Sequence, residues 1–167
     1  RRWIESHVPA GSKVLIDGGH TILTSGPRLQ QSREKLAQQL EMIRSLKEGQ
    51  TFDSAQVKIV DSYAAIYFEL LLKTNPPITY DLTTTELGRQ IEPLSYYVEH
   101  GYEYYVHNTE YEDNLADQNW RTKYPESTRF FESLGTSLEL LATFTPDAYR
   151  SGPVIKVYRF PRQAAGA

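Results

Sequence analysis

The sequence predicts an α/β domain in which a mostly parallel sheet lies between two layers of helices and ends in an antiparallel hairpin. Short apolar runs rich in β-branched and aromatic residues alternate along the chain with segments of helical periodicity. That alternation is typical of parallel strands joined by helices. The last two apolar runs, residues 138–144 and 154–160, are separated only by a turn-like segment, which favours a hairpin. We therefore expect a three-layer, Rossmann-like sandwich in a single domain, residues 1–162, with a frayed tail at residues 163–167.

The composition excludes several classes of protein. The chain has 167 residues, enough for one domain, and its formal net charge of -3 gives no basic field of the kind that binds nucleic acid. It has no cysteine, which excludes a disulfide framework and a thiolate metal site. The longest apolar run, residues 64–68, is far shorter than the roughly 20 residues that span a bilayer. The chain begins without a methionine or a signal-type apolar region, and we interpret it as part of a longer protein or as a processed product.

The first predicted elements are a short helix and a buried strand. Residues 3–7 have the pattern of a helix that stops before Pro9, because the residue that precedes a proline is pushed out of the helical region. Residues 14–16 form an apolar strand that ends at Asp17. The two glycines after Asp17 predict a tight loop up to His20.

A helical insert is predicted at about residues 26–75. Leucine and isoleucine recur at helical spacing up to Gly49, which we expect to end a first helix. A second helix is predicted from Asp53, whose carboxylate begins a capping-box pattern with Gln56. After the insert, apolar and polar side chains alternate over residues 78–83, which favours a half-buried strand near a sheet edge.

The centre of the chain combines a helix with the strand that we expect at the middle of the sheet. Residues 86–100 predict a short helix, and Gly101 is placed to end it because glycine adopts the left-handed conformation without steric cost. Residues 102–107 are aromatic or β-branched almost without a break, as in a strand covered on both faces. A polar loop is predicted at residues 108–119, and a helix that Gly135 ends comes next.

The candidate ligand-binding loops follow the first strand and the central strand. In α/β sheets, ligands bind beyond the carboxyl ends of the parallel strands. We therefore expect any acceptor or other ligand over these two loops, whose candidate residues are Asp17, Gly18, Gly19, His20, Asn108, Glu110, Tyr111, Glu112, Asp113 and Asp117.

These loops contain the residue types of acid–base catalysis and of metal binding, but their spacing matches no known motif for either. Asp17 and His20 are the most enzyme-like pair, because a carboxylate and an imidazole on a glycine loop can exchange protons with a substrate. A tight turn needs the same glycines, and the loop lacks the G-x-G-x-x-G spacing that holds phosphates. The acidic residues after His107 match no EF-hand, and a solvated acidic loop is the simpler interpretation. We therefore predict no catalytic residue, no metal and no cofactor.

Tyrosine and histidine have both a functional and a structural interpretation. Tyrosine rings stack on sugars, so the tyrosines between Tyr96 and Tyr124 would suit a carbohydrate-binding surface. Their strand and helix spacing places most of them in the core instead. The four histidines have no zinc-like spacing and more simply satisfy local hydrogen bonds.

Six segments form an ordered pattern along the chain: Trp3-Ile4-Glu5, Val-Pro-Ala-Gly-Ser-Lys-Val at residues 8–14, His-Gly-Tyr-Glu-Tyr-Tyr-Val at 100–106, Pro125-Glu126 with Phe130, Phe131 and Leu134, Phe144-Thr145-Pro146, and Gly-Pro-Val-Ile-Lys-Val-Tyr-Arg at 152–159. This pattern resembles the soluble C-terminal domain of multispanning membrane glycosyltransferases related to dolichyl-phosphate-mannose protein mannosyltransferases. It covers the chain from end to end, and the order of the segments is more specific than any one of them.

The resemblance implies a domain that follows the last membrane-spanning helix on the extracytoplasmic face of the membrane. In that family, acidic residues of the membrane part transfer a sugar from a polyprenyl phosphate, and no residue of this chain matches them. We therefore expect a non-catalytic domain whose partners are the membrane part of the same polypeptide and a glycan, protein or lipid-linked acceptor. Two alternatives stay open: a free-standing carbohydrate- or partner-binding module, and a small α/β enzyme that uses Asp17 and His20.

Overall fold

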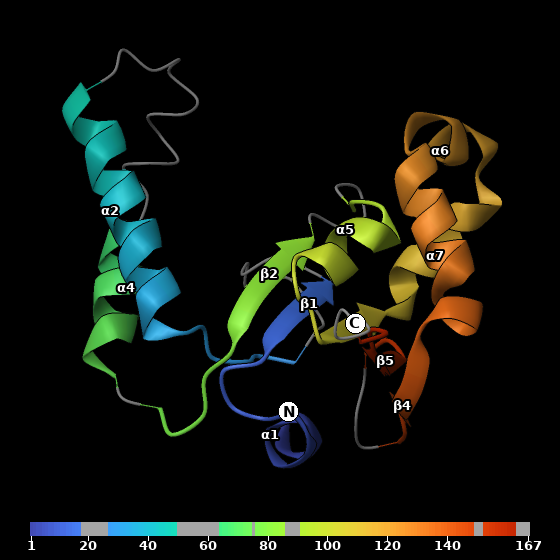
Figure 1. Ribbon diagram of the computed structural model, residues 1–167, viewed down its shortest axis with the longest axis horizontal. Helices are drawn as coiled ribbons and strands as arrows, with labels where there is room; N and C mark the ends of the chain where they lie inside the picture. The colour runs from blue at the N-terminus through green and yellow to red at the C-terminus, as the bar shows by residue number, and fades with distance from the viewer. Residues whose placement is uncertain (18–26, 50–63, 75, 86–90, 149–151, 163–167) are drawn as a thin grey trace, which may run out of the picture.

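A computed structural model shows an α/β fold built on one open, mixed sheet of five strands (Figure 1). It describes residues 1–17, 27–49, 64–74, 76–85, 91–148 and 152–162. The strand order is β2-β1-β3-β5-β4. Among the described residues, no helix is long and apolar enough to cross a membrane.

The sheet is parallel on one side and antiparallel on the other. Strand β1 (Lys13–Asp17) pairs in parallel with β2 (Asp81–Thr85) and with β3 (Tyr104–Asn108). Strand β5 (Ile155–Arg159) is antiparallel both to β3 and to β4 (Glu139–Phe144). The predicted parallel arrangement of the first three strands, the edge position of β2 and the closing hairpin are confirmed. Strand β3 lies at the centre of the sheet and all five of its residues are buried, as predicted.

One face of the sheet is covered by three helices, α5 (Leu94–Glu99), α6 (Gln118–Lys123) and α7 (Pro125–Ser137). Successive side chains of a strand point to opposite faces, so alternate residues of the sheet meet these helices. The resulting core contains Leu15, Ile91, Tyr97, Tyr102, Tyr105, Trp120, Phe130, Phe131, Leu134, Leu138, Tyr158 and Phe160. Helix α7 contributes three of these at helical spacing, which explains why the sequence forms a helix there.

The other face packs against the short helix α1 (Arg2–His7). Ile4 and Val8 are buried there against the remaining strand residues, which include Val14, Tyr104 and Val157. The helix stops before Pro9, as predicted, and the chain turns directly into β1.

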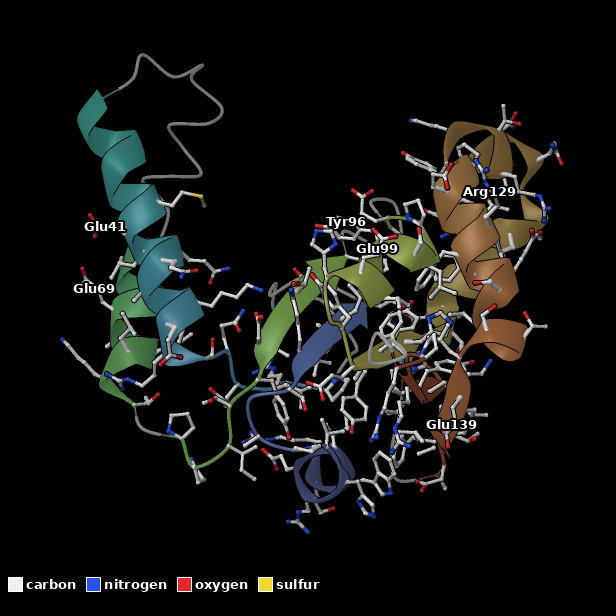
Figure 2. The ribbon with its side chains drawn as sticks, in the orientation of Figure 1. Glu41, Glu69, Tyr96, Glu99, Arg129 and Glu139 are labelled. Atoms are coloured by element: carbon white, nitrogen blue, oxygen red, sulfur yellow. The ribbon has the colours of Figure 1, made fainter. Side chains whose placement is uncertain are left out.

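Helices α2 (Arg33–Gly49) and α4 (Ala64–Lys73) pack against each other and extend away from the sheet beyond β2 (Figure 1). Gln31 anchors this pair, because its side chain donates to the carbonyl of Leu82 at 2.9 Å and accepts from the amide of the same residue at 2.8 Å. The side chain of Gln31 thus makes the two backbone hydrogen bonds with Leu82 that a neighbouring strand would otherwise make. Figure 2 shows Glu41 and Glu69 on the outer side of the helix pair.

Helix α5 ends in a Schellman motif at the glycine that the sequence indicated. Gly101 has a φ of 71°, and its amide donates to the carbonyl of Val98 at 3.1 Å. The amide of Tyr102 donates to the carbonyl of Tyr97 at 2.9 Å. These two bonds satisfy carbonyls that the end of a helix otherwise leaves free. The turn also brings the chain directly into β3.

Two predictions about local structure are wrong. Gly135 does not end α7, which continues to Ser137, because Gly135 has no left-handed φ. The predicted polar loop is helical: a 3-10 helix, η1 (Thr109–Ala116), leads into α6. Capping explains the difference, since the side chain of Asn108 accepts from the amide of Glu110 and that of Asp117 accepts from the amide of Asn119. The start of the second predicted helix, the first part of the helix predicted at residues 86–100 and the predicted tail lie outside the described residues.

Candidate functional site

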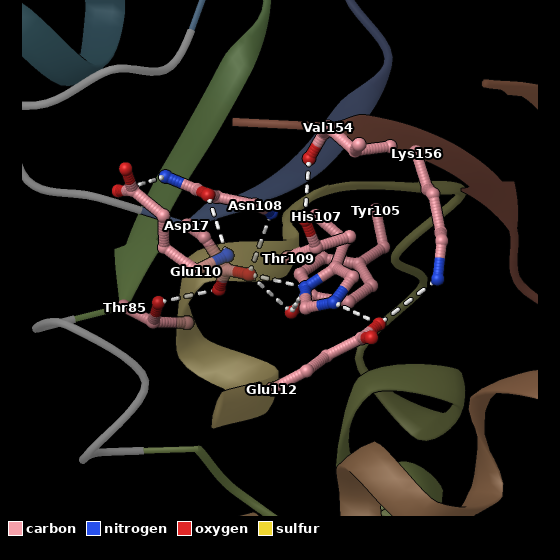
Figure 3. Close-up of polar contacts among 10 residues, drawn as sticks. All are labelled: Asp17, Thr85, Tyr105, His107, Asn108, Thr109, Glu110, Glu112, Val154 and Lys156. Carbon is pink, nitrogen blue, oxygen red and sulfur yellow. Dashed lines mark hydrogen bonds and ion pairs between the residues drawn. The ribbon is translucent and has the colours of Figure 1, made fainter. Parts of the chain in front are cut away.

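The candidate site lies at the carboxyl end of the sheet, where β1 and β3 run side by side (Figure 3). Ile16 of β1 pairs with Val106 of β3, so the next residues, Asp17 and His107, are neighbours at the end of the two strands. Asp17 lies on the same face as Leu15, and His107 on the same face as Tyr105, because side chains alternate along a strand. Sheet register alone therefore brings the carboxylate and the imidazole together.

The carboxylate of Asp17 is buried and fully bonded. It is 1% exposed. Its Oδ1 atom accepts a hydrogen bond from the hydroxyl of Thr85 at 2.7 Å. Its Oδ2 atom accepts from the hydroxyl of Tyr105 at 2.6 Å and from the amide of Asn108 at 3.2 Å, and it lies 2.6 Å from Nδ1 of His107. Burial of such a group is tolerated because each oxygen has donors within the fold.

His107 connects this carboxylate to a second one. Its Nε2 atom lies 2.8 Å from Oε1 of Glu112, and the same oxygen accepts from Nζ of Lys156 at 3.0 Å. An imidazole donates from both nitrogens only in its protonated form. With His107 protonated, Asp17, His107, Glu112 and Lys156 form a chain of alternating negative and positive charges. We call these four residues the charge chain.

The surroundings of the charge chain shift two pKa values. Burial on its own would raise the pKa of Glu112, but hydrogen bonds from Lys156 and His107 outweigh burial and lower it below the ordinary value. The pKa of Tyr105 is raised well above the ordinary tyrosine value by burial and by the adjacent Asp17 carboxylate. Tyr105 is therefore a hydrogen-bond donor at neutral pH, which is the role that Asp17 requires.

Asn108 links the end of β3 to η1. Its Oδ1 atom accepts from the amide of Glu110 at 3.0 Å, and its amide nitrogen lies 3.4 Å from Oε2 of the same residue. Thr109 then donates from both its amide and its hydroxyl to the carbonyl of Val154, each at 3.1 Å. The first turn of η1 is thus fixed to both β3 and the segment that leads into β5.

The structure brings four of the predicted site residues together: Asp17, Asn108, Glu110 and Glu112 (Figure 3). Two others lie further along the chain. Asp113 is exposed on η1, and Asp117 caps α6. Gly18, Gly19, His20 and the side chain of Tyr111 lie outside the described residues.

Sequence reasoning missed four participants: Thr85, Tyr105, Lys156 and, as the partner of Asp17, His107. Tyr105, His107 and Lys156 lie among aromatic or apolar strand residues, and Thr85 is the last of three successive threonines. The positions of Asp17 and His107 in the sequence could have indicated the contact between them, because both come at the end of strands that were predicted to be parallel. Lys156 faces His107 across the β3–β5 pair, a neighbour relation that only the strand order reveals.

The described side chains form no metal-binding group, and of the predicted Asp17–His20 pair they include only Asp17. Within the described ranges, no group of three or more histidine or acidic residues is arranged to hold a metal ion. Asp17 is shielded from solvent and already holds donors on both oxygens, so it is poorly placed to act as a base toward a substrate. Histidines His7 and His100 bond backbone carbonyls in their own helices, as predicted.

The tyrosines are mainly core residues, as their spacing predicted. Tyr97, Tyr102, Tyr104 and Tyr105 are all buried. Tyr96 is exposed on α5, where its ring stacks on His100 with centroids 3.9 Å apart. A broad carbohydrate-stacking surface is therefore not formed by the tyrosines that the structure describes in this region.

Comparisons of the chain with protein-family models, with curated proteins and with solved structures found no match.

Proposed function

We propose that this chain is a non-catalytic, soluble domain of a multispanning membrane glycosyltransferase that uses a polyprenyl-phosphate sugar donor. The domain would lie on the extracytoplasmic face of the membrane and aid acceptor binding or assembly with the membrane part of the same polypeptide. The ordered segments that resemble this family support the proposal. We further infer a three-layer, Rossmann-like arrangement, which is supported by helices on both faces of the sheet and by the parallel β1, β2 and β3.

The observation that supports a non-catalytic role is that the polar side-chain atoms of Asp17 and His107 are buried and already hydrogen-bonded within the charge chain and its neighbours. Catalytic acids and bases need a proton-accepting or proton-donating atom that a substrate can reach. Asp17 and His107 are 1% and 0% exposed, and every polar atom of their side chains is bonded inside the protein. A group of this kind holds structure rather than exchanging protons with a ligand.

The exposed acidic residues beside the charge chain are the proposed contact surface. Glu110, Asp113 and Asp117 are exposed on or next to η1, and the charge chain and Asn108 fix the start of this helix. A rigid support with exposed polar groups is the arrangement that binding loops on α/β sheets use. The acceptor would thus be held by hydrogen bonds to carboxylates, with no chemistry in this domain.

Charge removal from this surface tests the proposal in the full-length transferase. The variant Glu110→Gln, Asp113→Asn, Asp117→Asn removes three negative charges and keeps the shape of each side chain, and asparagine still caps a helix. We expect the acceptor KM to rise about tenfold, as for three exposed contacts of roughly 0.5 kcal/mol each, while kcat stays unchanged.

The matched control is Glu41→Gln, Glu69→Gln, Glu99→Gln, which removes the same charge from exposed positions elsewhere (Figure 2). An equal KM in both triple variants would overturn the proposed contact surface. The reading frame upstream of Arg1 tests the placement itself, because we expect it to encode several hydrophobic segments of roughly 20 residues. A start codon within a few residues of Arg1 would favour the free-standing binding module or the small enzyme instead.

A further inference from the structure

A pocket of about 220 Å³ lies at the opposite end of the sheet from the charge chain. It is formed where β3 begins and β5 ends, since Tyr104 pairs with Arg159 there. The turn at Gly101 contributes to its wall, so the Schellman motif that ends α5 also shapes the pocket. No residue of the pocket belongs to the candidate acceptor surface.

One side of the pocket is apolar and held rigidly. Tyr102 and Phe160 line it, and they are only 8% and 2% exposed because their rings also belong to the core. Their ring centroids lie 6.3 Å apart. The amide of Phe160 donates to the carbonyl of Glu103 at 2.9 Å, which ties the end of β5 to the start of β3. A pocket whose walls are core residues is preformed, and a ligand does not have to order it.

The other side of the pocket carries two cations and one anion. Arg159 and Arg162 line it together with Glu103. Arg159 donates one hydrogen bond to Glu139 at 3.1 Å, whereas its buried Nε atom has no partner among the described residues. Arg162 is exposed, and its guanidinium makes no hydrogen bond or ion pair within the part of the chain that the structure describes. The lining residues thus carry two positive charges and one negative charge, and Glu139, which is not part of the lining, pairs with Arg159.

The volume limits the size of a ligand. An apolar cavity of about 150 Å³ holds one benzene molecule. A pocket of about 220 Å³ therefore has room for a single six-membered ring with one small substituent.

We propose that this pocket binds a single six-membered ring that carries one carboxylate group. The ring packs against Tyr102 and Phe160, and the anion bonds to Arg162 and to the donors of Arg159 that Glu139 does not use. Guanidinium groups bind carboxylate and phosphate through charge-assisted hydrogen bonds, and aromatic side chains pack on the apolar face of a sugar or an aromatic ring. This site is separate from the proposed acceptor surface, so either proposal can fail without the other.

Titration of the chain with four probes, followed by NMR or calorimetry, tests the ligand class. The probes are glucuronate and benzoate, which combine ring and anion, glucose, which has only the ring, and inorganic phosphate, which has only the anion. We expect at least one of the first two to bind about tenfold more tightly than glucose and phosphate. Preference for glucuronate identifies a sugar acid as the ligand class, and preference for benzoate an aromatic acid. Absence of binding by both, or equal binding by glucose, would overturn the proposal.

Three variants separate a binding role from a structural one. Arg162→Gln is expected to weaken the best probe about tenfold. Glu103→Gln is expected to tighten it about two- to fivefold, because it removes the only negative charge of the lining and keeps an oxygen that accepts from the amide of Lys13. Arg129→Gln, at an exposed position on α7 (Figure 2), is the matched control and should change nothing. Equal affinity of the Arg162 and Arg129 variants would show that the pocket does not hold the anion.

Discussion

His107 lies between two carboxylates at the carboxyl end of the sheet. Its side chain is fully buried, and its two nitrogens lie 2.6 Å from Asp17 and 2.8 Å from Glu112. A buried ion pair adds little stability compared with an apolar pair of the same size, but the loss of one partner leaves an uncompensated charge. Removal of His107 alone is therefore expected to destabilise the fold more than replacement of the whole buried group by apolar residues.

The variant His107→Ala is expected to lower the free energy of unfolding by about 3 to 5 kcal/mol, because the buried Asp17 carboxylate loses the imidazole that lies 2.6 Å from it. Urea denaturation at neutral pH measures the loss. The control is His100→Ala, since His100 is exposed, stacks on Tyr96 and makes one hydrogen bond to the Tyr96 carbonyl, and it should cost less than about 1 kcal/mol. Similar losses in both variants would mean that the contact with His107 does not stabilise the folded protein.

At the scale of the element, glycine has two different roles in helices α5 and α7. Gly101 lies just beyond α5 with a φ of 71°, where a side chain is strained whatever space is available. Gly135 lies inside α7 without a left-handed φ, and a Cβ atom there would meet nothing within 4 Å. The same substitution should therefore have opposite effects at the two positions.

We expect Gly101→Ala to destabilise the protein by about 1 to 2 kcal/mol, the cost of a left-handed conformation for an L-residue. We expect Gly135→Ala to stabilise it by about 0.4 to 1 kcal/mol, because alanine favours the helix and restricts the unfolded chain. Thermal and urea unfolding of the two variants measure both signs in one experiment. Destabilisation by Gly135→Ala would contradict the continuous helix through residue 135.

Elements with strong apolar periodicity were predictable, and those defined by capping or by distant neighbours were not. Strands β1, β3 and β5 and the apolar stripe of α7 follow directly from local pattern. The 3-10 helix after Asn108 has no such stripe, and only the capping side chains of Asn108 and Asp117 indicated it. The strand order was not derivable, because pairing depends on tertiary contacts.

Some residues of the candidate site could likewise be identified from the sequence, and others could not. Asp17 and Asn108 were identified because strand ends are visible in the sequence. Tyr105 and Lys156 were not, because their contact with the site depends on which strands are neighbours and on the register between them. The sequence thus indicated the location of the site, whereas the pairing of charges in it required the fold.

At the scale of the whole molecule, tyrosines are buried on both faces of the sheet. Burial raises the pKa of five of them above the ordinary value of 10.0, namely Tyr80, Tyr97, Tyr102, Tyr105 and Tyr158. A raised pKa in the folded state gives stability that is complete below the unfolded value and is lost as the pH rises through the folded value. The protein should therefore be sensitive to alkali.

The free energy of unfolding is expected to fall steadily above about pH 10, and tyrosinate absorbance should rise together with unfolding. Tyr105→Phe should reduce this slope by about 1.4 kcal/mol per pH unit, the contribution of one proton. Tyr96→Phe, at an exposed position, is the matched control. A slope that is the same in both variants would show that Tyr105 ionises within the folded protein.

The pairing of β1 with β3 also has a consequence for synthesis on the ribosome. The contact between Asp17 and His107 spans 90 residues. At a translation rate of about 5 to 20 residues per second, β1 leaves the ribosome roughly 5 to 18 seconds before its central partner. During that interval an apolar strand, Val14 to Ile16, has neither of the neighbours that later cover it, because β2 also follows the long helical insert. Residues 14–16 are thus exposed to aggregation until the centre of the sheet forms.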